Sequence, residues 1–330
     1  MKSSADVDGQ SNRIAPSGRP RGAWVVDVGF VVAGCLPLAV AVLLGRAIGW
    51  FLAHVVRFRR RLVAAQIAAA FPEWTPERRR ETELAFYRHF GLLCVEMARQ
   101  SRTSRRFLRE NVVLHGTEHM DAALAKGKGV LALSGHFGSW ELALAAGAAH
   151  SYSLGIVFKE VKSELGQYAI DRIRGSHGVL GIPRRNSIFQ ILRQLRKNGV
   201  IGFVLDQNVT TEEGVFVEFL GRPACTMPGL AVLAQRTGAP VVPVFFHRDA
   251  DLRRHHIEFF PEVPWQAIPG NPSEELRVNT ARYTAVIEEF VRHHPDQWLW
   301  LHKRWKTQPS KAWIRAEKQQ NPPTSLEPES

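Results

Sequence analysis

The pattern of apolar and polar positions divides the chain into stretches of different character. From Trp24 to Val56 apolar residues dominate, and Val28 to Gly45 carries no charge over 18 residues. A helix that spans a bilayer needs about 20 such residues. The pattern therefore predicts a membrane-anchoring helix over 23–57, either a single span or a half-inserted monotopic helix. A buried core helix with a solvated charged end is the alternative.

Farther along, short apolar runs with the length of buried strands alternate with segments of helical periodicity. Alternation of this kind predicts an α/β fold with a central, mostly parallel or mixed sheet flanked by helices. Active residues are then expected at the strand ends. The expected strands are Val130–Leu133, Leu154–Phe158, Val200–Leu205, Val241–Phe246 and Ile257–Phe260.

Composition shifts set the remaining boundaries. We expect a disordered polar tail over 1–22, a basic helical segment over 58–111, an α/β core over 112–310 and a polar tail over 311–330. Local signals mark some helices within these parts. Thr75 and Pro76 indicate a helix start, Pro228 and Gly238 bracket a short helix, and a helix over 273–294 stops at Pro295.

The net charge of +12 changes the picture by favouring anionic partners, such as phosphate-bearing lipid, nucleic acid or an acidic carrier protein. Four arginines between Arg57 and Arg61 directly follow the apolar segment, which favours a cytoplasmic position beside anionic headgroups. The three cysteines are far apart and show no metal-ligand spacing, so reduced thiols are the simplest interpretation.

The stretch from Gly129 to Ala149 carries the strongest candidate chemistry. It reads as a strand, a sharp turn with His136 and a helix with Glu141 in its first turn, for which Ser139 is the expected N-cap. An ionised Glu141 could hold the imidazole in one tautomer, so that His136 acts as a general base. The alternative is a histidine that only satisfies a buried turn. A serine hydrolase at Ser134 is weakly supported, because Ala132 stands where the nucleophile elbow needs glycine.

Several motifs occur in order along the chain: H-F-G-S-W-E from His136, D-Q-N from Asp206, G-V-F-V-E-F-L-G-R-P-A-C-T from Gly214 and Q-W-L-W-L-H-K-R-W-K-T from Gln297. Over roughly residues 24 to 310 this order resembles the bacterial lipid A late acyltransferases, which carry the H-x4-D/E motif of the lysophospholipid acyltransferase superfamily. Ser139 departs from the asparagine expected there. Mycobacterial phosphatidylinositol mannoside acyltransferases are similar in outline.

The resemblance implies a glycerolphosphate acyltransferase-like fold and an O-acyltransferase at the cytoplasmic face of the bacterial inner membrane. The enzyme would move a fatty acyl chain from acyl-acyl carrier protein to a hydroxyl of a lipid A precursor, with His136 as base and Glu141 orienting it. No bound cofactor or metal is expected. His293 and His294 are interpreted as suiting the negative end of their helix rather than as metal ligands.

Further residues are candidates for substrate binding. Arg174 and Arg184 are the nearest matches to an arginine that binds the acceptor or carrier phosphate in the related enzymes. Asp206 follows a strand as His136 does, so both loops should face one cleft. Phe216 and Phe219 could line a lipid site or belong to a core strand. Arg304 lies among tryptophans and cations that suit a membrane surface or sugar phosphates.

Three other functions stay open at this point. One is an acyl-CoA-dependent acyltransferase that acts on another glycolipid, such as phosphatidylinositol mannoside. Another is a thioesterase in which water replaces the acceptor. A basic membrane-associated nucleic-acid-binding protein is the third, although only the charge supports it and no nucleic-acid-binding motif occurs, so nucleic acid is not an expected partner.

Overall fold

The computed structural model describes residues 19–158, 161, 163–184, 187–249, 254–310 and 313. Within these residues it has a seven-stranded sheet in the order β1-β9-β8-β2-β5-β3-β4 and a separate β6–β7 hairpin. Neighbouring strands of the sheet are parallel except β8 and β9, so the sheet is mixed but mostly parallel, as the alternating pattern predicts. The strands are β1 (Val112–His115), β2 (Val130–Ser134), β3 (Leu154–Phe158), β4 (Leu180–Pro183), β5 (Val200–Val204), β6 (Val215–Phe219), β7 (Arg222–Thr226), β8 (Val241–Arg248) and β9 (His255–Phe259).

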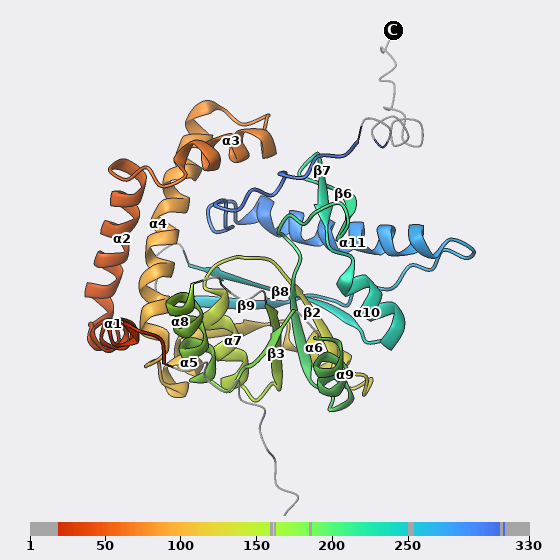
Figure 1. Cartoon of the computed structure of the whole chain (residues 1–330), viewed down its shortest axis with the longest axis horizontal. Coiled ribbons are helices and arrows are strands. Elements are labelled where there is room, and N and C mark those ends of the chain that lie inside the picture. The colour runs from red at the N-terminus through yellow and green to blue at the C-terminus, as the bar shows by residue number, and fades with distance from the viewer. Residues whose placement is uncertain are drawn as a thin grey trace, which may run out of the picture.

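Helices cover both faces of this sheet and form a separate group beside it (Figure 1). The helices are α1 (Ala23–Cys35), α2 (Leu38–His54), α3 (Arg60–Ala70), α4 (Pro76–Gln100), α5 (Arg105–Asn111), α6 (Thr117–Leu124), α7 (Trp140–Ala149), α8 (Glu164–Gly175), α9 (Ile188–Arg196), α10 (Gly229–Thr237) and α11 (Pro272–His293).

Strand β2 shows why the sheet is buried on both faces. All five of its residues are buried. Leu131 and Leu133 pack in a cluster with α10 and α11, whereas Val130 and Ala132 pack in a second cluster with α5, α6 and α7. Side chains alternate between the faces of a strand, so a continuous apolar run is what a strand covered on both sides requires.

The apolar N-terminal segment differs from the single helix expected over 23–57. It forms two helices, α1 and α2, because Pro37 interrupts the pattern and Leu36 adopts an extended conformation there. Among the described helices, none combines the length and apolar character that crossing a bilayer requires. The membrane-spanning form of the prediction therefore finds no support.

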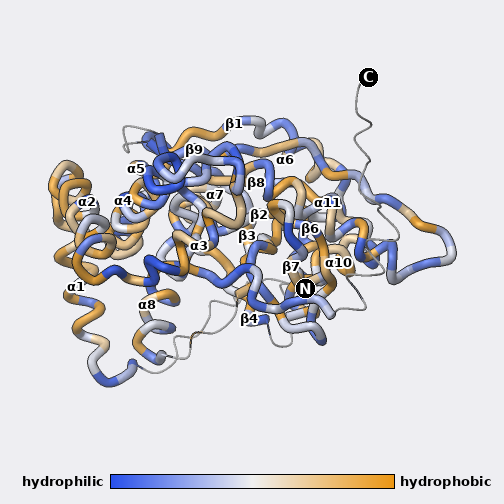
Figure 2. The backbone as a smooth tube through the Cα atoms, turned by 90° about the horizontal axis from the view of Figure 1, so that it is seen from above, coloured by the Kyte–Doolittle hydropathy of each residue, from blue (hydrophilic) through white to orange (hydrophobic). Residues whose placement is uncertain are grey.

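Helices α1 and α2 nevertheless expose many large apolar side chains. Trp24, Val32, Leu43 and Trp50 are each more than half exposed. Figure 2 shows hydrophobic residues dominating this end of the molecule, away from the sheet. These helices are therefore not buried core helices, and they leave a broad apolar surface beside the α/β core.

Close backbone contact holds α2 against α4. A Cβ atom added at Gly91 of α4 would collide with the backbone of Gly45 and Gly49 on α2, and one added at Gly45 would lie 2.8 Å from the Cα of Leu92. Only glycine permits such an approach. The N-terminal helices are thus fixed to the rest of the protein by α4.

Most sequence-based element predictions are confirmed. Thr75 caps α4 by accepting a hydrogen bond from the Arg78 N–H at 3.3 Å, and α10 ends at Gly238 with φ of 61°. Strands β1, β4 and β7 were not predicted, whereas β6 is the strand left open as an alternative for Phe216 and Phe219. Predicted tails over 1–22 and 311–330 lie almost wholly outside the described residues.

Candidate active site

The parallel pairing of β2 with β5 brings two polar side chains together at the carboxyl ends of these strands. His136 follows β2 and Asp206 follows β5. The Nδ1 atom of His136 lies 2.8 Å from Oδ1 of Asp206, and the backbone N–H of His136 donates to Oδ2 at 2.7 Å. The expectation that the two loops face one cleft is confirmed.

The turn that carries His136 is held from several sides. Gly138 has φ of 50°, and a Cβ atom there would lie 2.7 Å from the carbonyl oxygen of Phe246, so glycine is needed for conformation and for space. The Leu299 N–H donates to the His136 carbonyl at 3.0 Å. Trp298 Nε1 donates to Asp206 Oδ2 at 2.7 Å. The segment after α11 therefore fixes both members of the pair.

The electrostatics of the pair follow from its burial and its charges. Burial alone would lower the pKa of His136, but the charge of Asp206 and the hydrogen bond to it raise that pKa above its ordinary value. Burial opposes ionisation of Asp206, yet His136 and the donated hydrogen bonds hold its pKa at about 2. Asp206 is thus an anion at neutral pH and favours the protonated imidazole.

Glu141 does not make the contact with His136 that the sequence led us to expect. Its carboxylate binds Arg174 of α8, with Nε at 3.0 and 3.1 Å and Nη2 at 2.5 Å. Both side chains are at least nine-tenths buried. A permanently charged cation stabilises a buried carboxylate better than an imidazole that titrates, and Arg174 of α8 supplies that cation. Asp206, not Glu141, bonds the imidazole directly.

Ser139 also differs from expectation, because it stands at the N-cap position of α7 but its side chain caps nothing. Its hydroxyl oxygen is buried without a hydrogen-bond partner among the described residues.

A cavity of about 820 Å³ opens beside His136 and runs between the sheet and α7. The sheet contributes the lining residues Ala132, Gly202 and Val244, and α7 contributes Leu144. Much of the wall is apolar and includes Met120, Ile156, Phe246 and Phe259. A volume in this range holds a sizeable ligand, and the lining suits a hydrocarbon chain.

Polar residues gather where the cavity opens. Arg174 and Arg184 both line it, and Arg184 pairs with Glu213 at 3.0 Å. Lys303 and Lys306 line it too, although sequence reasoning selected their neighbour Arg304. The sequence signal for these lysines is the run of cations among the tryptophans. Spacing alone does not show which of these cations face the cavity.

Three predicted substrate-binding residues are placed elsewhere. Phe219 and Arg304 have no exposed surface, and Arg304 donates to the carbonyls of Gln207 and Cys225, each at 3.1 Å, with its guanidinium over the Phe219 ring. Phe216 lies on the β6–β7 hairpin, 5.3 Å from the ring of Trp313, and does not line the cavity. Phe219 and Arg304 support the site from the core, which corrects the expected direct contact.

A group of side chains that could hold a metal ion lies apart from this cavity. It consists of His247, Glu258 and His294. None of the three lines the cavity, and none takes part in the His136–Asp206 pair.

The fold and this site define an α/β enzyme in which His136, paired with Asp206, lines a largely apolar cavity. A family model described as bacterial lipid A biosynthesis acyltransferase matches residues 17–307. The chain belongs to this family and is an O-acyltransferase.

Relatives with assigned names agree with the family. A lipid A biosynthesis acyltransferase of Haemophilus influenzae is 23% identical over 85% of this chain and 86% of its own length. A lipid A biosynthesis palmitoleoyltransferase of Escherichia coli is 24% identical over 83% and 87%. A phosphatidylinositol mannoside acyltransferase of Mycobacterium tuberculosis is 28% identical over 58% of this chain and 60% of its own length.

Proposed function

We propose that this protein transfers a fatty acyl chain from acyl-acyl carrier protein to a hydroxyl group of a lipid A precursor. The observation that carries the proposal is that His136, whose side chain is partly exposed, lines a large and mostly apolar cavity. An acyl chain would enter the cavity and leave its thioester carbonyl beside the imidazole. The names of the relatives that match most of the chain support lipid A as the acceptor class.

His136 would act as the general base. With Nδ1–H donated to Asp206, the lone pair of the imidazole stands on Nε2. The amide nitrogen of Gln207 lies 3.2 Å from Nε2, a position that an acceptor hydroxyl would take in the complex. Nε2 then removes the hydroxyl proton while the oxygen attacks the thioester carbon.

The remaining steps balance without another reactant. The new C–O bond forms as the carbonyl oxygen becomes an oxyanion, and the C–S bond breaks when that intermediate collapses. The proton held by His136 passes to the departing thiolate of the carrier's phosphopantetheine arm. Asp206 stabilises the imidazolium between these events, because its carboxylate remains ionised throughout.

Arg174 is the residue we assign to the developing negative charge. Arg174 lines the same cavity, and its Nη1 atom is buried without a hydrogen-bond partner among the described residues. Glu141 holds the rest of the guanidinium, so the free N–H groups are fixed in direction before substrate binds. In this proposal Glu141 acts on the reaction through Arg174.

Cations at the mouth would receive the phosphates of the acceptor or of the carrier arm. Arg59, Lys303 and Lys306 line the opening, and Lys303 and Lys306 are exposed. Their charge also suits the acidic surface of a carrier protein.

The apolar face of α1 and α2 supports a position at the cytoplasmic face of the bacterial inner membrane. Trp24, Leu43 and Trp50 would enter the interface, and the exposed Arg57 and Arg61 would lie beside anionic headgroups. In this arrangement the acceptor lipid reaches the site without leaving the bilayer.

The test is product analysis with purified protein, acyl-labelled acyl carrier protein and a lipid A precursor. Wild type should yield acylated glycolipid, and H136A should lower the rate by about 10²- to 10⁴-fold, the range for a positioned base. H293A, which removes an exposed histidine, should match wild type. Free fatty acid as the main product would instead indicate a thioesterase.

A second candidate rests on the mycobacterial relative. The same assay with acyl-CoA and a phosphatidylinositol mannoside measures it directly. Faster transfer with that donor and acceptor than with acyl-carrier protein and a lipid A precursor would replace the first proposal.

A further inference from the structure

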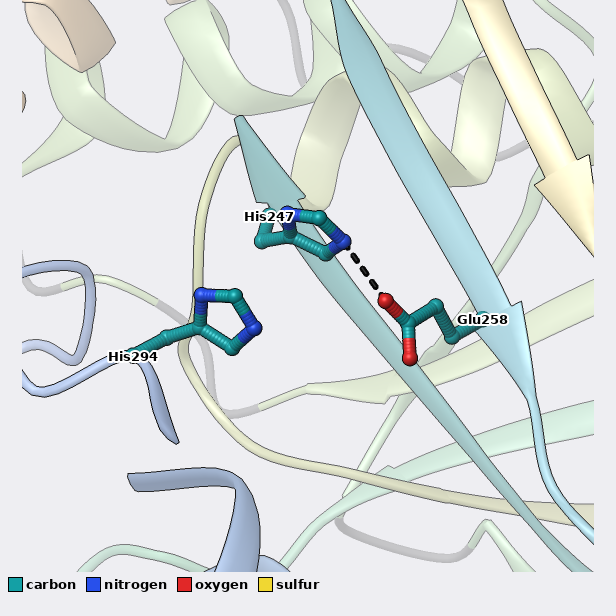
Figure 3. Close-up of side chains that lie close together, drawn as sticks. All are labelled: His247, Glu258 and His294. Carbon is teal, nitrogen blue, oxygen red and sulfur yellow. Dashed lines mark hydrogen bonds and ion pairs between the residues drawn. The ribbon is translucent and has the colours of Figure 1, made fainter. Parts of the chain in front are cut away.

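Three side chains from three different elements converge on one partly buried point outside the active site (Figure 3). His247 comes from β8, Glu258 from β9 and His294 from the residue that ends α11. One ring nitrogen of each histidine and one carboxylate oxygen lie within 4.8 Å of one another. We propose that His247, Glu258 and His294 bind a divalent cation of the zinc class, with water completing the coordination.

The donor set fits zinc and related borderline metals. Two imidazole nitrogens and one carboxylate oxygen form a set that suits Zn²⁺, whereas Mg²⁺ and Ca²⁺ prefer oxygen donors alone. Tetrahedral zinc sets its ligand atoms about 3.4 Å apart, given metal–ligand distances near 2.0–2.2 Å. Ligand atoms up to 4.8 Å apart must move closer to reach this spacing, whereas His247 Nε2 and the Glu258 oxygen, now 2.6 Å apart, must separate. Glu258, whose side chain is 31% exposed, has the freedom to do so.

The two histidines are held in position to coordinate. Their rings lie nearly parallel with centroids 4.4 Å apart, so one ring must tilt for both lone pairs to meet on a metal; Figure 3 shows a nitrogen atom of each ring on the side of Glu258. His247 Nε2 already lies 2.6 Å from a carboxylate oxygen of Glu258. Burial lowers the pKa of both imidazoles, which favours the neutral form that binds metal.

The neighbouring histidine is excluded as a ligand but supports the site. His256 stacks on His247 at 4.8 Å, and its two ring nitrogens contact His115 at 2.9 Å and Asp249. Both of its donor positions are therefore used. Its stacked ring restricts the orientation of the His247 ring.

A metal here would tie the β8–β9 pair to the segment that supports the active site. The carbonyl of His294 accepts from the Gln297 N–H at 3.0 Å, and Gln297 in turn bonds the backbone of Arg248 and, through its carbonyl, Gly138. Trp298, the next residue, holds Asp206. The cation would act as a structural clamp on this segment rather than in the reaction.

Zinc titration of the full-length, untagged protein after chelator treatment tests the proposal. Calorimetry with ZnCl₂ should show one ion bound per chain, and the variants H294Q and E258Q should each weaken binding at least about tenfold. H293Q removes the adjacent exposed histidine and should bind as wild type does. Mg²⁺ should not compete.

Thermal unfolding separates loss of the site from loss of the fold. Saturating Zn²⁺ should raise the melting temperature of wild type and H293Q by several degrees but leave H294Q and E258Q unchanged. Without metal, the variants should melt near wild type, which shows that they fold. Absence of stoichiometric binding by wild type, or binding and stabilisation that survive both H294Q and E258Q, would overturn the proposal.

Discussion

At the scale of single residues, the ionised Asp206 beside His136 has a direct consequence for the pH dependence of the reaction. A general base must be neutral, so the rate rises with pH through the pKa of His136. That pKa is raised above 6.5 because the Asp206 charge and hydrogen bond outweigh burial. In D206N the raising charge is gone. We expect the rising limb of the kcat/KM profile to move to lower pH and the plateau to fall on the order of 10²-fold.

The measurement is kcat/KM over the pH range in which the protein stays folded, for wild type and D206N. An unchanged midpoint in the variant would show that Asp206 does not set the basicity of His136.

The buried Glu141–Arg174 pair predicts a large stability effect. R174A leaves the Glu141 carboxylate, whose side chain is 3% exposed, without its cation, and breaking such a pair costs about 3–5 kcal/mol. R106A breaks the exposed pair with Glu110 and should cost less than about 1 kcal/mol. Denaturant unfolding in detergent compares the two variants, and equal costs would contradict a buried role for the pair.

The sequence pattern identified the histidine of the site but assigned its partner to the wrong carboxylate. His136 and Asp206 could be placed together because both follow strands whose carboxyl ends share one edge of the sheet. The Arg174 contact depends on where α8 packs, and no spacing within the sequence encodes that position. Trp298 lies 92 residues from Asp206, so its hydrogen bond was likewise beyond local patterns.

At the scale of elements, the contact between α2 and α4 depends on glycine. G91A would push a Cβ atom into the backbone of α2, and we expect a loss of about 1–3 kcal/mol from overpacking. G29A is the matched control, because a Cβ at Gly29 on α1 meets nothing within 4 Å. That variant should be neutral or stabilising, since alanine favours helix more than glycine does. Thermal unfolding of both variants measures this difference, and equal melting temperatures would contradict the close packing of α2 on α4.

Elements were predictable where a local signal marked them. Thr75 with Pro76 fixed the start of α4, and Pro228 with Gly238 bracketed α10. A strand at Phe216 and Phe219 was among the alternatives, but its pairing with β7 was missed because the turn uses Leu220 and Gly221 at positive φ, and a leucine gives no turn signal. The order of the strands depends on long-range pairing, which periodicity does not contain.

At the scale of the whole molecule, the apolar face of α1 and α2 predicts binding to membranes. L43D places a charge on a side chain that is 68% exposed, and we expect at least about tenfold weaker binding to vesicles with anionic lipid. F189D changes a phenylalanine that is 80% exposed on α9, which lies apart from α1 and α2 at the lower edge of the view in Figure 1, and should bind as wild type does.

Vesicle sedimentation measures both variants. Equal binding of L43D and wild type would show that another surface faces the lipid.

The broad architecture followed from the alternation of apolar runs, but the cavity did not. Its walls combine β2, β3, β5, β8 and β9 with α6 and α7, so its existence depends on how far α7 stands from the sheet. Small residues such as Gly202 and Ala143 leave the space, and their role becomes visible only once the strands are in register.

The most direct test of the account is to locate the acyl chain. An acyl-acyl carrier protein whose chain ends in a photoreactive diazirine would be bound to the protein, irradiated and mapped by mass spectrometry. If the cavity holds the acyl chain, crosslinks fall on cavity residues such as Leu144, Ile156 and Phe259. Crosslinks confined to the exposed face of α1 and α2, with none in the cavity, would contradict it.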